Sequence, residues 1–196
     1  CLVEAASDEG WELEWDVVVE CAGTPYDETE RIIQREMGSN FPFETVRLNA
    51  IERFLKNVNK HGVPFKNGAE RLFDFLDEKS VPYGLATTTR RISVDDILGK
   101  AKIADRFKVV VCGDEVADNK PHPEIYYKAA DGLGLNIQNI IVFEDSANGI
   151  SSAVSAGARV IWVPDLQDLP DSIRNTCYGE AGSLDAVCDR WEELSG

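Results

Sequence analysis

The chain has 196 residues, of which 43% are hydrophobic and 28% charged, and its formal net charge at pH 7 is −15. A chain of this length and composition can bury a core without covalent or metal staples, which argues against disorder. The acidic excess argues against binding to nucleic acid or to an anionic membrane, because both need a basic surface. A small anionic ligand held by a local cation remains compatible with it.

The cysteines and the apolar runs exclude several classes of protein. The five cysteines are odd in number and form no CxxC pair, which argues against a disulfide framework or a zinc site. The longest apolar runs, such as residues 140–143, are too short to span a bilayer. A cytoplasmic monomer or weak dimer is expected, or an organellar one if a transit peptide has been removed.

Residues 1–65 show helix-like apolar spacing, punctuated by Gly10, Gly23 and Gly38, with no strand of period two. From residue 66 onward, short continuous apolar runs alternate with helical patterns. We predict strands at 82–86, 109–111, 140–143 and 160–163, and helices at 69–79, from an N-cap at Ser93, at 123–133, 147–156 and 183–194, with a loop at 164–182. This alternation predicts a parallel sheet covered on both faces. The chain is therefore expected to hold a helical unit (1–65) and an α/β unit (66–196).

Ligands of open α/β sheets bind beyond the carboxyl ends of the strands. Thr87 and Thr88 follow the first predicted strand, and Glu144 and Asp145 end the third. Lys120 begins the segment KPHP, before a helix, and the two prolines that follow it would stiffen the backbone and hold its ammonium in place.

Each feature also has an ordinary structural interpretation. The threonines could cap the next helix, and the acidic pair could favour a helix dipole. Lys120 could be a solvated surface residue. Together, however, hydroxyls and an ammonium suit phosphate oxygens, whereas paired carboxylates suit Mg²⁺. At one rim of one sheet, this combination indicates magnesium-assisted phosphoryl transfer.

Three segments resemble the haloacid dehalogenase superfamily of phosphohydrolases, in its β-phosphoglucomutase-like branch. They are GLATTT at 84–89, GDEV to KPHPEIY at 113–126, and VFEDSANGI at 142–150. The resemblance covers nearly the whole chain. It implies a Rossmann-like α/β core with a helical cap at 1–65, with Thr87, Thr88 and Lys120 on the phosphoryl group and Glu144 and Asp145 on Mg²⁺.

The first motif of that superfamily, a strand ending in Asp-x-Asp-Gly-Thr, has no counterpart here. Its first Asp is the nucleophile that forms an aspartyl phosphate, so the resemblance places the nucleophile upstream of Cys1. In the family this strand lies between the strands that carry the other motifs. The 196 residues alone are therefore expected to be inactive.

The expected substrate is a small phosphorylated metabolite of the sugar phosphate or phosphoglycolate type. Mutases of this branch carry an arginine shortly after a cap glycine, but Thr24 to Asp27 follow Gly23 here, and Arg31 comes a turn later. This favours a phosphatase over a phosphomutase. Trp11 and Trp15 are expected in the core of the helical unit. A non-catalytic or truncated binding module is the alternative outside the enzymes.

Overall fold

The computed structural model describes residues 1–196, which divide into two compact units, Cys1–Pro64 and Phe65–Gly196. Their boundary differs by one residue from the one expected from the sequence. No helix combines the length and the apolar character that crossing a membrane requires.

The first unit is entirely helical, as its apolar spacing predicts. It contains α1 (Leu2–Asp8), α2 (Trp15–Glu20), α3 (Tyr26–Met37) and α4 (Phe43–His61). Ala5, Ile33 and Val46 are fully buried in a core that this unit does not share with the second. Trp11 packs against that core, but Trp15 is 56% exposed, so the prediction of a core position for Trp15 is wrong.

The second unit alternates strands with helices. Its strands are β1 (Gly84–Ala86), β2 (Val109–Val111), β3 (Ile141–Glu144), β4 (Arg159–Trp162) and β5 (Gly179–Glu180). Its α-helices are α5 (Ala69–Glu78), α6 (Arg91–Ala101), α7 (Glu124–Leu133), α8 (Ala147–Ala156), α9 (Asp171–Arg174), α10 (Leu184–Asp189) and α11 (Trp191–Ser195). Short 3-10 turns precede β2 at Ala104–Arg106, follow it at Gly113–Glu115, and precede β3 at Ile137–Asn139.

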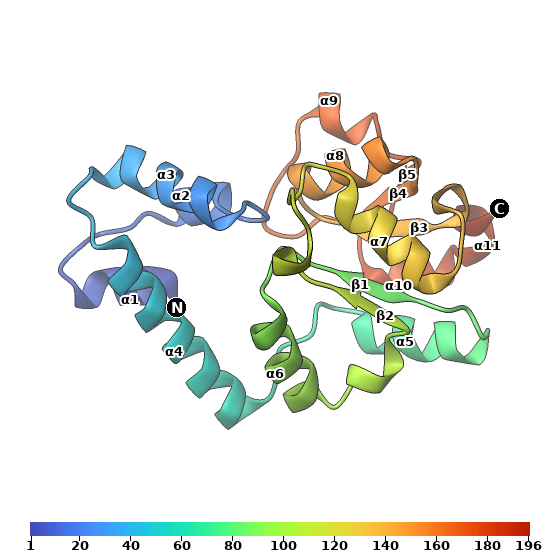
Figure 1. The fold of residues 1–196 in the computed structure, drawn as a ribbon, viewed down its shortest axis with the longest axis horizontal. Helices are drawn as coiled ribbons and strands as arrows, with labels where there is room; N and C mark the ends of the chain where they lie inside the picture. The colour runs from blue at the N-terminus through green and yellow to red at the C-terminus, as the bar shows by residue number, and fades with distance from the viewer. The chain divides into compact units, whose positions relative to one another are not determined.

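All strand pairs are parallel, which confirms the α/β prediction, but the strands form two sheets and not one. The first sheet is β1–β2 and the second is β3–β4–β5 (Figure 1). No ladder joins β1 to β3, so the single sheet that the alternation predicts is divided into two.

Helices cover both faces of the second sheet. Val160 and Trp162 pack with residues of α7 and α8, whereas the alternate residues Ile161 and Val163 pack with α5, α10 and α11. Successive side chains of a strand point to opposite faces, so both faces of β4 are buried. The continuous apolar runs in the sequence have this cause.

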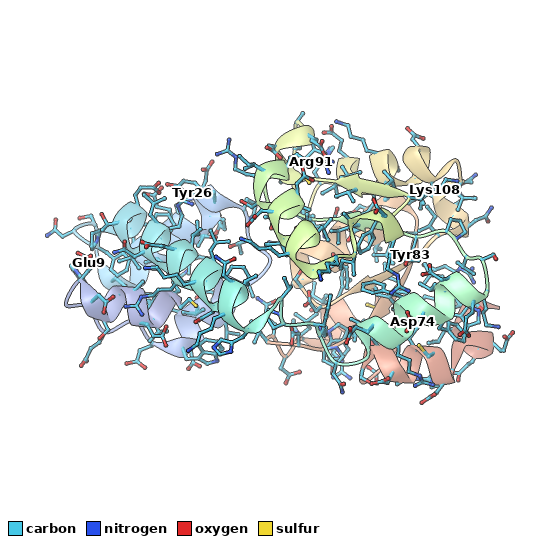
Figure 2. The ribbon with its side chains drawn as sticks, turned by 90° about the horizontal axis from the view of Figure 1, so that it is seen from below. Glu9, Tyr26, Asp74, Tyr83, Arg91 and Lys108 are labelled. Carbon is cyan, nitrogen blue, oxygen red and sulfur yellow. The ribbon has the colours of Figure 1, made fainter.

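The first sheet packs closely because two glycines leave room for Val109. A Cβ on Gly84 would lie 2.5 Å from Val109 Cγ1, and one on Gly132 would lie 2.4 Å from Val109 Cγ2. Tyr83 and Lys108, which are labelled in Figure 2, directly precede β1 and β2. The Lys108 N–H donates to the Tyr83 carbonyl oxygen at 3.0 Å. The register then runs from Gly84 opposite Val109 to Ala86 opposite Val111.

Three predicted elements need correction. α6 begins at Arg91 and not at Ser93, because Asp114, from the turn after β2, accepts a hydrogen bond from the Arg91 N–H at 2.8 Å. The predicted loop at 164–182 contains α9 and β5, and β5 is held by pairing with β4. The predicted final helix is interrupted at Arg190, whose guanidinium donates to the Glu180 carbonyl oxygen at 2.9 Å.

Candidate active site

Lys120 lies buried between the carboxyl ends of β1 and β3. Its Nζ donates to Glu144 Oε1 at 2.5 Å and to the Ala86 carbonyl oxygen at 3.1 Å. The two side chains are only 8% and 9% exposed, and the Lys120 ammonium also lies 5.0 Å from the centre of the Tyr126 ring. The rim predicted from the strand ends therefore does gather Lys120, Glu144 and the residue before Thr87.

Glu144 accepts hydrogen bonds on both of its carboxylate oxygens. Lys120 and the Tyr126 hydroxyl, which is 2.5 Å away, donate to Oε1. The Ser146 hydroxyl and the Asp145 N–H donate to Oε2, each at 3.2 Å. A carboxylate offers about four lone-pair positions, so these four donors saturate Glu144.

The titration properties of this cluster follow from burial and pairing. Burial raises the pKa of Glu144. The charge of Lys120 and the hydrogen bonds that Lys120 and Tyr126 donate to Glu144 outweigh this effect, so the pKa of Glu144 lies below its ordinary value. Burial, together with the charge of Glu144, raises the pKa of Tyr126 well above its usual range. Glu144 is therefore an ionised acceptor and Tyr126 a protonated donor.

Gly149 lets Glu144 adopt this position. A Cβ on Gly149 would lie 2.0 Å from Glu144 Oε2, so any larger residue would collide with the carboxylate. Ser146 caps α8 by accepting from the Gly149 N–H at 3.1 Å while donating to Glu144. Ser146 therefore fixes both the start of α8 and the position of the Glu144 carboxylate.

Thr87 and Thr88 lie in the turn after β1, half-buried. The Thr87 N–H extends the ladder to the Val111 carbonyl oxygen at 3.0 Å, and its Oγ1 accepts from the Thr89 N–H at 3.1 Å. Thr87 follows Ala86, whose carbonyl binds Lys120, so this hydroxyl and the ammonium belong to one rim.

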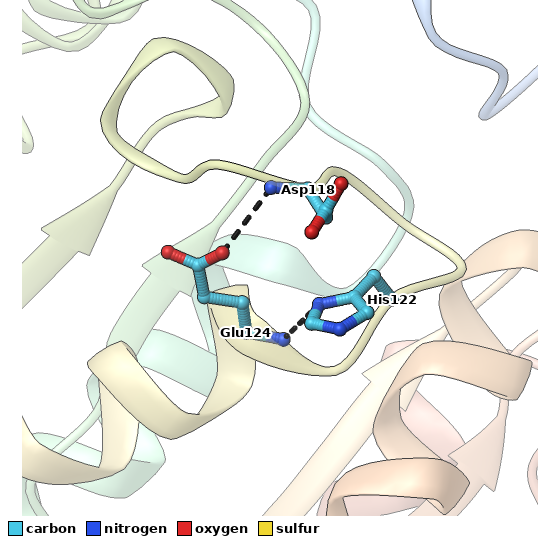
Figure 3. A group of neighbouring side chains, drawn as sticks. All are labelled: Asp118, His122 and Glu124. Atoms are coloured by element: carbon cyan, nitrogen blue, oxygen red, sulfur yellow. Dashed lines mark hydrogen bonds between the residues drawn. The ribbon is translucent and has the colours of Figure 1, made fainter.

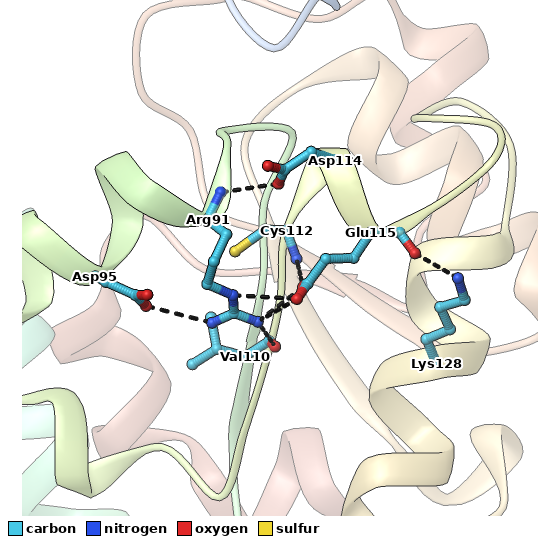
Figure 4. A network of polar contacts seen from close by, with 7 residues as sticks. All are labelled: Arg91, Asp95, Val110, Cys112, Asp114, Glu115 and Lys128. Carbon is cyan, nitrogen blue, oxygen red and sulfur yellow. Dashed lines mark hydrogen bonds and ion pairs between the residues drawn. The ribbon is translucent and has the colours of Figure 1, made fainter.

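The turn after β2 contacts both the threonine turn and Arg91, and Figure 4 shows how Asp114 and Glu115 bind Arg91. The Gly113 N–H donates to the Thr89 carbonyl oxygen at 3.0 Å, and Glu115 accepts from the Arg91 guanidinium at 2.7 and 2.9 Å. Glu115 also accepts from the Cys112 N–H at 2.8 Å. Asp114 and Glu115 therefore hold Arg91, the first residue of α6, which follows the threonine turn.

Asp145 is more exposed than Glu144 and has a different partner. Its Oδ2 lies 3.5 Å from Lys66 Nζ, which also lies 3.6 Å from Asp165 Oδ2 and donates to the Val163 carbonyl oxygen at 3.2 Å. Burial raises the pKa of Asp145, the charges of Glu144 and Asp165 add to the rise, and Lys66 opposes it, leaving the pKa above its ordinary value.

The oxygen atoms around Asp145 fit Mg²⁺. Carboxylate oxygens of Asp145 and Asp165 and the carbonyl oxygen of Val163 surround the Lys66 ammonium. Oxygen atoms of this kind are the ligands that Mg²⁺ prefers. Glu144 is less well suited to bind Mg²⁺, because its carboxylate oxygens already accept four hydrogen bonds. It could bind a metal only by exchanging one of its four hydrogen bonds.

A second group of possible metal ligands consists of Asp118, His122 and Glu124, whose ligand atoms lie within 4.8 Å of one another (Figure 3). Glu124 is already engaged, because its Oε2 accepts from the Ala117 and Asp118 N–H groups and its Oε1 pairs with Lys128. The His122 Nδ1 accepts from the Glu124 N–H at 3.4 Å. These contacts order the segment around Lys120 without any ligand.

Sequence reasoning missed Tyr126, Ser146, Arg91 and Lys66. Tyr126 and Ser146 lie inside the segments that resemble the superfamily's motifs. A polar side chain next to apolar positions in such a segment could have indicated a role in the site. Nothing in the sequence around Lys66 distinguishes it from other lysines. Only the fold brings it to Asp145.

Comparison with known proteins agrees with this geometry. Residues 5–163 match the family described as haloacid dehalogenase-like hydrolase. The chain belongs to the haloacid dehalogenase-like hydrolase family. The expected hydrolase family and its Rossmann-like α/β fold are thereby confirmed.

Individual relatives support the same family. The chain is 35% identical over 116 residues to the protein CbbY of Rhodobacter capsulatus, covering 58% of this chain and about half (51%) of that protein. It is 30% identical over 159 residues to a phosphorylated carbohydrates phosphatase of Thermotoga maritima, covering 74% and 73% of the two chains.

The fold is also found in solved structures. CbbY of Rhodobacter sphaeroides, in complex with phosphate, superposes with a TM-score of 0.77 at 22% identity, covering 95% of this chain and 86% of that one. At this identity the likeness concerns the fold.

Proposed function

We propose that this chain belongs to a phosphatase that hydrolyses a small phosphorylated metabolite of the sugar phosphate or phosphoglycolate type. The observation that carries the proposal is the buried Lys120 ammonium, held by Glu144 beside the threonine turn. The relative from Thermotoga maritima, named for action on phosphorylated carbohydrates, supports the substrate class.

In this proposal, Lys120 and the hydroxyls of Thr87 and Thr88 bind the oxygens of the transferring phosphoryl group. A preorganised cation and fixed donors stabilise the charge that spreads over these oxygens in the transition state. Glu144 and Tyr126 hold Lys120 at its place, so little reorganisation is needed when the substrate binds.

We further propose that the enzyme uses Mg²⁺, bound through Asp145. When bound, the metal neutralises charge on the phosphoryl oxygens. Glu144, the other expected ligand, holds Lys120, and serves the metal directly only if one of its four hydrogen bonds is exchanged. The helical unit is proposed to act as the cap that selects the substrate.

The nucleophile is proposed to be an Asp on a strand that precedes these residues in the full protein. Glu144 is the carboxylate at Lys120, and its saturated oxygens make it unsuitable for attack. The absence of a ladder between β1 and β3, whose carboxyl ends share Lys120, supports a strand in that position. Backbone groups of an unpaired edge inside a fold are costly, so such a strand would stabilise the unit.

The test is a screen of phosphate monoesters, with and without Mg²⁺, on the chain joined to the segment that precedes it. Turnover that is lost in Lys120→Ala and Asp145→Asn supports the proposal. Lys79→Ala is the matched control, because Lys79 is exposed and pairs with Glu192, away from these residues. If the full-length protein turned over no phosphoester, a binding module would be the better description.

The phosphomutase alternative gains no support from the helical unit. Thr24, which follows the cap glycine, donates to the Cys21 carbonyl oxygen at 2.8 Å and shares a hydrogen bond with Thr29. Arg31 forms an ion pair with Glu28 on its own helix. A requirement for a bisphosphate, with isomerised product in the same screen, would select the mutase.

A further inference from the structure

Lys66 lies three positions before α5 in sequence, yet its ammonium reaches the segments that follow two strands. It contacts the Val163 carbonyl oxygen at 3.2 Å, Asp145 Oδ2 at 3.5 Å and Asp165 Oδ2 at 3.6 Å. Asp145 directly follows β3, and Asp165 lies three positions after the end of β4. Three oxygen atoms from the segments that follow β3 and β4 thus surround the positive charge of Lys66.

The contacts of Lys66 are loose compared with those of Lys120. Both carboxylate distances are at or beyond the limit of a good hydrogen bond, whereas Lys120 lies 2.5 Å from Glu144. Lys66 is also 29% exposed, so water can reach it. An ammonium held in this way can leave its partners without exposing a buried charge.

The charges around Lys66 do not balance. Glu144 is neutralised by Lys120, so Asp145 and Asp165 together carry two negative charges against the single positive charge of Lys66. A divalent cation at the same oxygens would balance this pair of carboxylates fully, and it prefers hard oxygen ligands of this kind.

We propose that Lys66 is an exchangeable counter-cation that competes with a divalent metal for Asp145 and Asp165. In the metal-free protein its ammonium stabilises the two carboxylates. When the metal binds, Lys66 leaves them and swings toward water. This inference rests on the proposed function only in taking Asp145 as a metal ligand.

The direct test is the affinity of the full-length protein for Mn²⁺, a spectroscopic substitute for Mg²⁺, measured by electron paramagnetic resonance without substrate. Lys66→Met removes the competitor, so we expect its Kd to fall by roughly tenfold or more. Lys66→Arg keeps the charge and should remain within about threefold of wild type, because the competing charge is retained. Lys79→Met, which removes a surface lysine paired with Glu192, is the matched control and should not change Kd.

Asp145→Asn separates the two hypotheses. If Asp145→Asn abolishes Mn²⁺ binding but Lys66→Met binds no more tightly than wild type, the metal site stands and the competition is refuted. If Asp145→Asn binds Mn²⁺ like wild type, the proposed metal site itself is wrong. Circular dichroism of each variant shows whether it has folded.

A second measurement needs no variant. The rate at which an amine-acylating reagent labels Lys66, followed by peptide mass spectrometry, should rise several-fold when Mg²⁺ is added, because the ammonium loses its carboxylates. Lys79 should be labelled at an unchanged rate. Slower or equal labelling of Lys66 in Mg²⁺ would show that it does not exchange with the metal.

Discussion

At the scale of single residues, the Lys120–Glu144 pair is the most deeply buried ion pair of the α/β unit, since its two side chains are only 8% and 9% exposed. Breaking a buried pair from one side leaves an uncompensated charge, so we predict that Lys120→Met lowers the free energy of unfolding by about 3–5 kcal/mol. The double variant Lys120→Met, Glu144→Gln should recover most of this loss. Urea denaturation measures both, and Lys128→Met should cost less than about 1 kcal/mol. A double variant as unstable as the single one would argue against this interpretation.

The same pair predicts a dependence of stability on pH. The folded pKa of Glu144 lies below its unfolded value, so its contribution is complete above about pH 4.3 and is lost as the pH falls through the folded value. We expect the free energy of unfolding to decline more steeply with acidification in wild type than in Glu144→Gln. Equal slopes between pH 5 and pH 3 would contradict the assignment of an ionised, paired Glu144.

At the scale of elements, the contact between the turns after β1 and β2 depends on Gly113. A Cβ there would lie 2.2 Å from the Thr88 carbonyl oxygen, a backbone atom that must then move. We predict that Gly113→Ala costs about 1–3 kcal/mol and lowers kcat/KM for the phosphoester, because it displaces the hydroxyls proposed to bind the phosphoryl oxygens in the transition state.

Gly99, within α6, is the matched control for Gly113. Nothing lies within 4 Å of a Cβ added there, and alanine favours a helix interior. Gly99→Ala should therefore stabilise the protein by up to about 1 kcal/mol and leave kcat/KM unchanged. A similar loss of kcat/KM in both variants would show that the turn contact is not its cause.

At the scale of the whole molecule, the two units have separate cores. The core that contains Ile33 lies entirely within Cys1–Pro64, and the three other buried clusters lie within Phe65–Gly196. Ile33→Ala removes a fully buried side chain and should cost the helical unit about 2–5 kcal/mol. Hydrogen exchange with mass spectrometry should show faster exchange at residues 1–64 and unchanged protection at β3 and β4. Loss of protection across both units would mean that they unfold as one.

The sequence by itself determined the elements and the chemical character of the rim. β2 and α8 have the predicted bounds, because a continuous apolar run and a capped small-residue helix depend mainly on local chemistry. The motifs placed Thr87 and Glu144 at strand ends and Lys120 before a helix, and parallel strands bring their carboxyl ends to one edge by topology alone.

The tertiary structure alone decided which of these side chains are paired. Asp114 reaches across to cap α6, β4 recruits β5, and Lys66 meets Asp145 although 79 positions separate them. It also decided that Glu144 and Asp145, identical in kind by sequence, differ in use. One is buried and saturated by Lys120 and three other donors, while the other stays accessible beside an exchangeable ammonium. Such differences arise from burial and from long-range contacts, which the local pattern of a sequence does not encode.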